Sequence, residues 1–486
     1  MAAGFFFYDL ETSGFDPKQA RIMQFAGQRT DDALNPVGDP VNILIKLTAD
    51  TLPDPDAIMV TGITPQATLS DGITEAEFLK YFYENVVQPD TIFLGYNSVR
   101  FDDEFMRYLH YRNYYDAYRW HWCDGCSRWD ILDVVRMTRA LRPEGIVWPF
   151  SPDGKPSNRL ELLTSVNKID HFAAHDALSD VNATIAVTKL IKDKQPKLFQ
   201  YLLDMRDKRK VAGLVQSGEP FAYSSGTYPS EHEKTTAVVK VTDLPNGQGA
   251  LVYNLRFDPK LLAGMTVEQL ADRWRWRKER PADEPPLPVK AVKFNKCPAV
   301  APLNVIDPDS QKRIGIDLAA AKRHAEALRS LPDFGAKLLA AMEILDKERP
   351  QLALLANEHE VDGQLYDGFL DERDHDMMGV VRASRAHEIA SLSPHFHDQR
   401  LRNLWPLYKA RNYPEALTSE ERAVWDAFCM HRLMGGGANA RMAKYFARIQ
   451  ALATTPNIPN AKQYILEELK LYGESVLPTD NSESDV

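Results

Sequence analysis

Residues 4–12 read Gly4-Phe5-Phe6-Phe7-Tyr8-Asp9-Leu10-Glu11-Thr12, in which four consecutive aromatic side chains precede two acids two positions apart. The run is too short for a free-standing helix and is typical of a buried central strand. Side chains at i and i+2 of a strand share a face, so we expect Asp9 and Glu11 side by side. Neighbouring carboxylates repel each other unless cations lie between them, and Mg²⁺ prefers oxygen ligands. Taken alone, the pair equally fits two solvated acids at a strand end.

The length and composition limit the class of protein. A chain of 486 residues predicts two to four domains, because single cores rarely grow past about 250 residues. A hydrophobic content of 44%, with 10% aromatic residues, argues against global disorder. No apolar run approaches the roughly 20 residues of a membrane span, and the N-terminus lacks a secretion signal. We therefore expect a cytoplasmic protein with no membrane partner.

Charge and cysteine usage add two further limits. The net charge of −10 argues against a uniformly basic surface, but a local basic groove on an acidic body remains compatible with nucleic-acid binding. Cys123 and Cys126 form a C-x₂-C pair close to His121, whereas a structural zinc site normally needs a second pair. Cys297 and Cys429 are isolated, so we expect free thiols rather than zinc or a disulfide framework.

The first part of the chain mixes strand and helix signals. Residues 21–30 and 41–47 are strand-like and are separated by turn residues, which predicts an antiparallel meander with the first strand. Residues 61–65 are expected to form a loop. Thr74 begins a capping box for a helix through about Val87, and residues 91–96 form another buried strand. This alternation predicts an α/β domain.

A second acid-bearing segment follows. Residues 97–105 pass from a strand through a loop into a helix, which places Asp102 where the helix dipole favours an acid. Alone, Asp102 fits a helix cap equally well. Aromatic and basic residues follow closely, and they suit either stacking on unpaired bases or the filling of a core. They are Arg107, Tyr108, Tyr111, Tyr114, Tyr115, Tyr118, Trp120 and Trp122.

Three helices complete the first segment. Residues 130–141 are amphipathic, and a short helix begins at residues 159–163. Residues 171–180 lead into a long helix that ends near Lys192. With His175 at the helix entry and Asp180 one turn in, both side chains can face one cleft. A histidine before a helix is otherwise usually structural.

The rest of the chain changes character. Strand-like runs at residues 235–241, 249–255 and 289–294 predict a small β-rich unit, with a turn at Asn246-Gly247. Residues 316–345 have helical spacing with an interruption at Leu331-Pro332, and Arg349-Pro350 predicts a break. Helical periodicity then runs from about residue 352 to 473. The last residues, 479–486, are polar and acidic, which predicts disorder.

Between Asp9 and Asp180, the order Asp-x-Glu, Asp, His-x₄-Asp resembles that of the DEDD exonucleases that carry a catalytic histidine. Longer stretches in all three segments resemble the bacterial exodeoxyribonuclease I (exonuclease I) family, so the resemblance covers nearly the whole chain. Oligoribonuclease and polymerase proofreading subunits share only the first segment. The stretches are residues 61–66, 95–104, 111–113, 127–130, 141–145, 174–177, 295–298, 364–366 and 410–412.

The resemblance implies a multidomain α/β fold. We expect an RNase H-like exonuclease domain at residues 1–195 and an SH3-like β-rich domain with helical additions at 196–350. A C-terminal helical domain at 352–475 and a disordered acidic tail at 476–486 complete the expectation. The family also implies a monomer.

The resemblance implies a 3′-to-5′ exonuclease that releases 5′-mononucleotides from single-stranded DNA with a free 3′ end, in bacterial repair and recombination. Asp9, Glu11 and Asp180 would hold two Mg²⁺ ions directly, with Mn²⁺ as a substitute, and Asp102 would hold the second ion through water. One ion would generate the attacking hydroxide and the other would stabilise the leaving oxygen. His175 would take the proton from the water.

The resemblance also implies residues that touch substrate. Arg159 matches an arginine that contacts substrate, and its charge suits a phosphate, although a helix-capping arginine is the alternative. The resemblance implies that Glu11 binds substrate as well as metal. The other candidates for DNA contact are Arg107, Tyr118, Trp122, Arg136, Lys296, Gln364 and Tyr366.

One protein partner is implied too. The family binds the acidic, Phe-ending tail of single-stranded-DNA-binding protein, and Arg142, Tyr201 and Arg313 lie at matching positions. Gly335 stands where the family often has another basic residue, which predicts a weaker site.

Two alternative functions remain open at the level of sequence. An RNA-trimming exonuclease would use the same site, because the contacts to the 2′-OH that distinguish RNA leave no sequence pattern. A non-catalytic DNA-binding scaffold is the other, although a binding module needs no set of four acids and a histidine.

Overall fold

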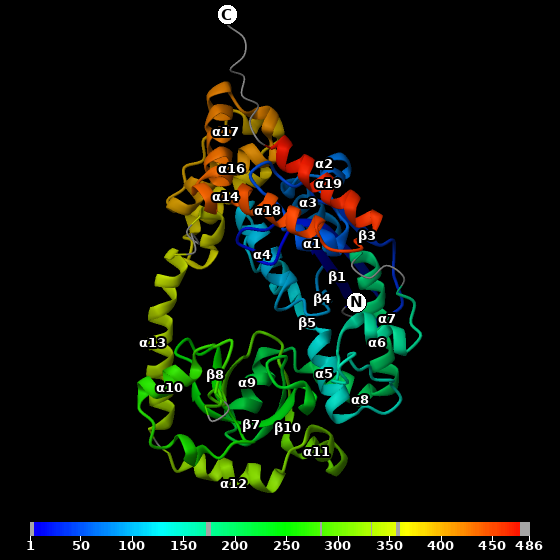
Figure 1. Cartoon of the computed structure of the whole chain (residues 1–486), viewed down its shortest axis with the longest axis vertical. Coiled ribbons are helices and arrows are strands. Elements are labelled where there is room, and N and C mark those ends of the chain that lie inside the picture. The colour runs from blue at the N-terminus through cyan, green and yellow to red at the C-terminus, as the bar shows by residue number, and fades with distance from the viewer. Residues whose placement is uncertain (1–3, 172–175, 282–283, 332, 356–359, 477–486) are drawn as a thin grey trace, which may run out of the picture.

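The structure is a computed structural model and describes residues 4–171, 176–281, 284–331, 333–355 and 360–476. The two sheets lie apart: β1, β4 and β5 of the first lie near the middle of the molecule, and the second lies in its lower part (Figure 1). The C-terminal helices lie beside the first sheet, and the long helix α13 (Phe334–Leu355) runs from the second sheet back to them. The last segment of the chain therefore packs against the first.

The aromatic stretch forms the central strand of the first sheet, as predicted. The strand order is β3-β2-β1-β4-β5, with β1 antiparallel to β2 and parallel to β4. The antiparallel meander is confirmed. Phe5, Phe6, Phe7 and Tyr8 are all buried, because both faces of the sheet are covered. The strands are β1 (Phe5–Thr12), β2 (Ile22–Thr30), β3 (Val41–Leu44), β4 (Ile92–Gly95) and β5 (Ser127–Asp130).

Five helices of the first segment, α3 to α7, begin near the predicted positions, whereas α1 and α2 were not predicted. The capping box at Thr74 and Glu77 is present, and the helix continues as a π-helix at Phe82–Val86. The expected loop at residues 61–65 is shorter, because helices end at Thr61 and begin at Pro65 on either side of it. The helices are α1 (Pro55–Thr61), α2 (Pro65–Asp71), α3 (Glu75–Tyr81), α4 (Asp102–Arg112), α5 (Ile131–Leu141), α6 (Leu160–Val166) and α7 (Ala177–Lys194).

The aromatic run begins within α4, and apart from the partly buried Tyr115 its members form two groups. Tyr108, Tyr111, Tyr114 and Trp120 are buried and fill the core. Tyr118 and Trp122 are exposed. The core-filling alternative therefore holds for the first group, and only the second group can stack on a ligand.

The second sheet is antiparallel throughout, in the order β10-β6-β7-β8-β9. Three of its strands were predicted, whereas β6 and β10 are four residues long and too short for a periodicity signal. The strands are β6 (Phe221–Ser224), β7 (Thr235–Asp243), β8 (Gly249–Asn254), β9 (Val289–Lys293) and β10 (Ala299–Pro302). The helices are α8 (Pro196–Asp204), α9 (Lys208–Gln216), α10 (Val267–Trp274), α11 (Pro308–Ile314) and α12 (Leu318–Arg329).

The predicted break at Arg349-Pro350 is wrong, because α13 continues to Leu355. An interior proline costs about 3 kcal/mol and one hydrogen bond, which a long helix can absorb. The predicted interruption between α12 and α13 is confirmed, although Pro332 itself lies outside the described residues, as do residues 477–486 of the expected tail. The C-terminal helices are α14 (Glu372–Ala383), α15 (Ala386–Ile389), α16 (Gln399–Asn412), α17 (Ser419–Met434), α18 (Arg441–Ala453) and α19 (Asn460–Ser475).

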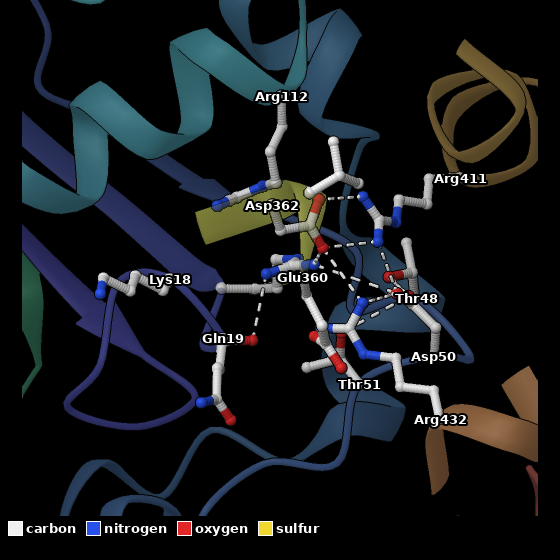
Figure 2. A network of polar contacts seen from close by, with 12 residues as sticks. Lys18, Gln19, Thr48, Asp50, Thr51, Arg112, Glu360, Asp362, Arg411 and Arg432 are labelled. Atoms are coloured by element: carbon white, nitrogen blue, oxygen red, sulfur yellow. Dashed lines mark hydrogen bonds and ion pairs between the residues drawn. The ribbon is translucent and has the colours of Figure 1, made fainter. Parts of the chain in front are cut away.

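A buried ion cluster joins the first segment to the C-terminal helices (Figure 2). Asp362 accepts hydrogen bonds from Arg21 at 2.7 Å and from Arg411 at 2.7 Å. Asp50 accepts from Arg411 at 2.7 Å and from Arg432 at 2.9 Å. Burial opposes ionisation of both acids, but the three arginines outweigh it and hold each pKa below the ordinary aspartate value. We name these five residues the ion cluster.

The cysteines and the lengths of the helices bear on two further predictions. All four cysteines are free thiols, as predicted. None of the helices in the described ranges combines the length and apolar character that crossing a membrane requires.

Candidate active site

Three of the predicted acids come together at the end of the central strand. Asp9 and Glu11 share one face of β1, and Asp180 lies in the first turn of α7, which packs against β1 and β2. Asp176 caps that helix by accepting a hydrogen bond from the Ser179 N–H at 3.1 Å. One carboxylate oxygen from each of Asp9, Glu11 and Asp180 lies within 4.8 Å of the others. This spacing allows one cation to contact all three.

The electrostatics of this group favour bound cations. Burial, followed by the charges of Asp9 and Asp180, raises the pKa of Glu11 to about 9. Burial, followed by Asp102 and Asp180, raises the pKa of Asp9 well above its ordinary value. Asp102 is the first residue of α4, and burial raises its pKa as well. Divalent ions relieve such repulsion and suit an all-oxygen set of ligands.

A histidine contacts the acid group, but it is not the predicted one. His175 lies outside the described residues. The Nε2 atom of His171 lies 2.5 Å from Oδ1 of Asp180, and its Nδ1 atom lies 3.2 Å from the Thr164 hydroxyl. Sequence reasoning assigned His171 no role. Its signal was its place four residues before His175, on the approach to the same helix.

Cationic side chains surround the acids. Asp9 and Asp180 line a cavity of about 450 Å³, together with the predicted substrate residues Arg136 and Arg159. Arg159 is the N-cap residue of α6 but makes no side-chain capping bond, and it forms an ion pair with Glu161. The structure therefore does not support the alternative that the Arg159 side chain caps the helix.

A lysine from the second sheet reaches the same cavity. Lys234 lies just before β7 and has a positive φ of 55°, which turns the chain sharply at this point. Burial, followed by the charge of Arg136, lowers its pKa. Sequence reasoning missed Lys234, because only the packing of the second sheet against the first segment brings it near Asp9.

Several other predicted DNA contacts meet at Glu104, two residues after Asp102 in α4. Glu104 lies 2.5 Å from Arg107 and 2.7 Å from the Lys296 Nζ, and it accepts a hydrogen bond from the Tyr366 hydroxyl at 2.5 Å. The Arg107 guanidinium lies over the Tyr118 ring, 5.2 Å from its centroid.

Trp122 lies in the segment after α4 that also carries Tyr118, and Gln364 lies in the segment that carries Tyr366. Trp122 is exposed beyond the Arg119–His121 turn. The backbone oxygen of Gln364 accepts a hydrogen bond from Arg400, in the turn that precedes Tyr366.

The predicted partner residues lie on the far side of α5. Arg142 forms an ion pair with Asp307 at 3.1 Å, and Arg313 donates to the Ala140 oxygen at 2.7 Å. Burial raises the pKa of Tyr201 to about 12. A Cβ at Gly335 would lie 3.2 Å from the Thr242 Cβ, so a larger side chain there requires the neighbour to shift.

The first sheet is mixed and carries paired acids on its central strand. A third acid comes from α7, and a cation-lined cavity adjoins the group. These features together define a metal-dependent nuclease. Family models match three parts of the chain: "Exonuclease" at residues 6–188, "Exonuclease I SH3-like domain" at 206–343 and "Exonuclease I C-terminal domain" at 359–476. The chain belongs to the exonuclease I family.

The similarity to relatives extends over the whole length. The exodeoxyribonuclease I of Haemophilus influenzae is 38% identical, over 97% of this chain and 98% of that protein. The moderately thermophilic exonuclease I of Methylocaldum szegediense superposes with a TM-score of 0.91 and 40% identity, over 98% of this chain and 100% of the other. Escherichia coli exonuclease I in complex with a dA16 oligonucleotide gives 0.90 and 36%, over the same shares. These relatives confirm the predicted family and fold class.

Proposed function

We propose that this protein is an exonuclease that removes 5′-mononucleotides from the 3′ end of single-stranded DNA, in bacterial repair and recombination. The proposal rests mainly on three carboxylates that lie together, two of which line a cavity that also has cationic side chains in its wall. The solved complexes of the E. coli relative with dA16 and with a 5cy-dT13 oligonucleotide support a single-stranded DNA substrate.

The acids are proposed to hold divalent metal. Asp9, Glu11 and Asp180 would be direct ligands, with Asp102 holding a second ion through water, and their mutual repulsion supports this role. Two Mg²⁺ ions, or Mn²⁺ in their place, are the proposed occupants, because these ions prefer oxygen ligands. The zinc-bound form of the E. coli exonuclease I complex with single-stranded DNA supports the binding of a divalent ion. When bound, such ions activate a water and stabilise the leaving oxygen.

Side chains of this chain would supply the rest of the chemistry. His175 is proposed to accept the proton of the attacking water, because its unperturbed pKa near 6.5 suits neutral pH. His171 would orient Asp180 through their 2.5 Å contact. Arg136, Arg159 and Lys234 surround the cavity and would hold the terminal phosphates.

The strand would leave the cavity along the group around Glu104. Its exposed aromatic rings, on Tyr118 and Trp122, suit stacking on unpaired bases. Arg107 and Lys296 suit phosphates, and Gln364 and Tyr366 supply polar contacts from the C-terminal segment. Groups from all three segments would then hold one strand, which favours single-stranded over duplex DNA.

A second surface is proposed to bind protein. Arg142, Tyr201 and Arg313 would take the acidic, Phe-ending tail of single-stranded-DNA-binding protein, and a solved complex titled "SSB/Exonuclease I" supports this partner. The tight packing around Gly335 supports a weaker site than one with a further basic side chain. We further propose a cytoplasmic monomer with domain limits at 1–195, 196–350 and 352–475.

The test is the release of label from single-stranded DNA carrying either a 3′ or a 5′ label, with duplex DNA and RNA of the same sequence alongside. We expect immediate loss of the 3′ label only, dependent on Mg²⁺ and abolished by EDTA. Preference for RNA would overturn the substrate while keeping the site. No cleavage of any substrate would leave a DNA-binding scaffold.

A further inference from the structure

One carboxylate joins three distant segments of the chain. Glu104 lies on α4 and receives Arg107 from the same helix at 2.5 Å. Lys296, from the connection between β9 and β10, lies 2.7 Å from it, and the Tyr366 hydroxyl from the C-terminal segment donates to it at 2.5 Å. Two cations and a hydroxyl thus converge on a single anion.

The segment that carries Lys296 is held in place by other contacts. Arg128 donates to the Asn295 oxygen at 2.6 Å, and the Cys297 thiol donates to the Arg128 oxygen at 3.2 Å. Lys296 itself also donates to the Val99 oxygen at 3.3 Å. Removing the charge of Glu104 therefore leaves this connection docked.

The segment that carries Tyr366 has independent anchors as well. Asp362, four residues earlier, belongs to the ion cluster, and Arg400 donates to the Gln364 oxygen at 3.0 Å. The Tyr366 ring meets the edge of the Tyr108 ring at a centroid distance of 5.9 Å. Glu104 is therefore not what assembles the three segments.

The donors around Glu104 are those that a backbone phosphate uses. Arginine, lysine and hydroxyl groups bind carboxylate and phosphate oxygens with similar geometry. The Tyr366 side chain is 52% exposed, and the exposed Trp122 lies on the chain segment that follows α4, so a strand can approach from solvent.

We propose that Glu104 is a built-in competitor of DNA, whose carboxylate takes the place of one backbone phosphate and must release Lys296 and Tyr366 before the strand can bind them. This inference rests on the proposed path of the strand. Because Glu104 offers both groups a partner when a phosphate departs, it lowers the cost of moving the strand onward by one nucleotide. It therefore makes binding weaker and stepping easier.

The test uses the full chain in EDTA, which prevents cleavage, and the binding of a fluorescent oligothymidylate followed by anisotropy. We expect Glu104→Gln to tighten binding about fivefold, because one competing anion is lost. The slope of log Kd against log salt concentration should steepen by about one, because the freed cation neutralises one more phosphate, which then releases its condensed counterions. In the presence of Mg²⁺, KM should fall while kcat does not rise.

Two further variants make the result specific. Glu474→Gln removes the same charge from an exposed i,i+4 pair with Lys470 and should leave Kd unchanged. Lys296→Met should weaken binding and abolish the gain from Glu104→Gln in the double variant, because the released cation is then missing.

The outcomes separate the inference from the function on which it rests. Unchanged or weaker binding by Glu104→Gln, with weaker binding by Lys296→Met, overturns the competitor role and leaves the DNA path intact. Unchanged binding by Lys296→Met and Arg159→Ala overturns the path itself.

Discussion

Two groups of acids in this chain have opposite electrostatic environments. In the ion cluster, Asp50 and Asp362 face three arginines, and the pKa of each lies below its ordinary value. At the candidate active site, the charged neighbours that dominate the pKa of Asp9 and Glu11 are other carboxylates, and both values are raised. Burial opposes ionisation of the acids in both groups, so burial alone does not explain the difference.

The difference lies in where the compensating charge comes from. The chain supplies its own cations to the ion cluster. The cluster fixes the C-terminal segment against the loop before β2, through Arg21, and against the loop after β3, through Asp50. At the candidate active site the cations stop at the cavity wall, where Arg136, Arg159 and Lys234 can meet a phosphate. Carboxylates that repel one another in this way favour cations from solution, which is what a metal-dependent nuclease needs. Charge balance therefore separates structural acids from catalytic ones.

The largest expected effect comes from Asp180→Asn. It removes one proposed metal ligand without changing side-chain size, so kcat should fall by roughly three or more orders of magnitude. Stability in EDTA should be unchanged or higher, because one repelling charge is gone. Single-stranded DNA cleavage and thermal melting measure the two quantities. Asp193→Asn, on the exposed face of α7, is the control and should change neither.

Retention of most activity by Asp180→Asn would remove this residue from the site. A large loss of stability in EDTA would contradict the comparison itself, since it would show that Asp180 is compensated by the fold.

The next largest effect concerns the ion cluster. Asp362→Asn leaves Arg21, Arg411 and Arg432 with Asp50 as their buried acid and with Glu360, which pairs with Arg432 at 3.2 Å. The free energy of unfolding should therefore fall by about 3–5 kcal/mol. Urea unfolding measures this, while kcat at low temperature should remain within a few-fold. Asp426→Asn, exposed on α17, should change stability by no more than about 0.5 kcal/mol. A loss below about 1 kcal/mol for Asp362→Asn would show that the cluster is not needed for stability.

The sequence predicted the candidate site better than its surroundings. The resemblance to the DEDD exonucleases implied that Asp180 joins Asp9 and Glu11, and strand periodicity predicted that Asp9 and Glu11 share a face. The central position of β1 followed from its unbroken aromatic run. These signals are local, so they can be read without knowing how distant segments pack.

Apart from the contact between His171 and Asp180, the contacts that sequence reasoning missed are long-range. The ion cluster joins residues 21 and 50 to residues 362, 411 and 432, and no periodicity links them. Lys234 reaches the cavity only through the packing of the second sheet, and Glu104 gains its partners in the same way. The proline at position 350 gave a local signal for a break, which the long helix α13 overrode.

The smallest expected effect is a pH dependence of stability that differs between the two groups. Glu11 has a pKa near 9 in the folded chain and about 4.5 when unfolded, so the folded state binds the extra proton between these values. Its contribution to stability is therefore lost as pH rises from about 5 to 9. The ion cluster behaves oppositely, because lowered pKa values keep its contribution above about pH 4 and lose it only in acid.

In EDTA, the melting temperature should therefore fall by a few degrees between pH 6 and 9. Added Mg²⁺ should restore the melting temperature more strongly at the higher pH, because fewer protons then compete with Mg²⁺ for the carboxylates. Asp180→Asn should flatten the slope in EDTA, because Glu11 then ionises with less repulsion, and Asp193→Asn should not. A melting temperature that rises across this range in EDTA would mean that Asp9 and Glu11 are already compensated by the chain, and the contrast between the two acid groups would no longer hold.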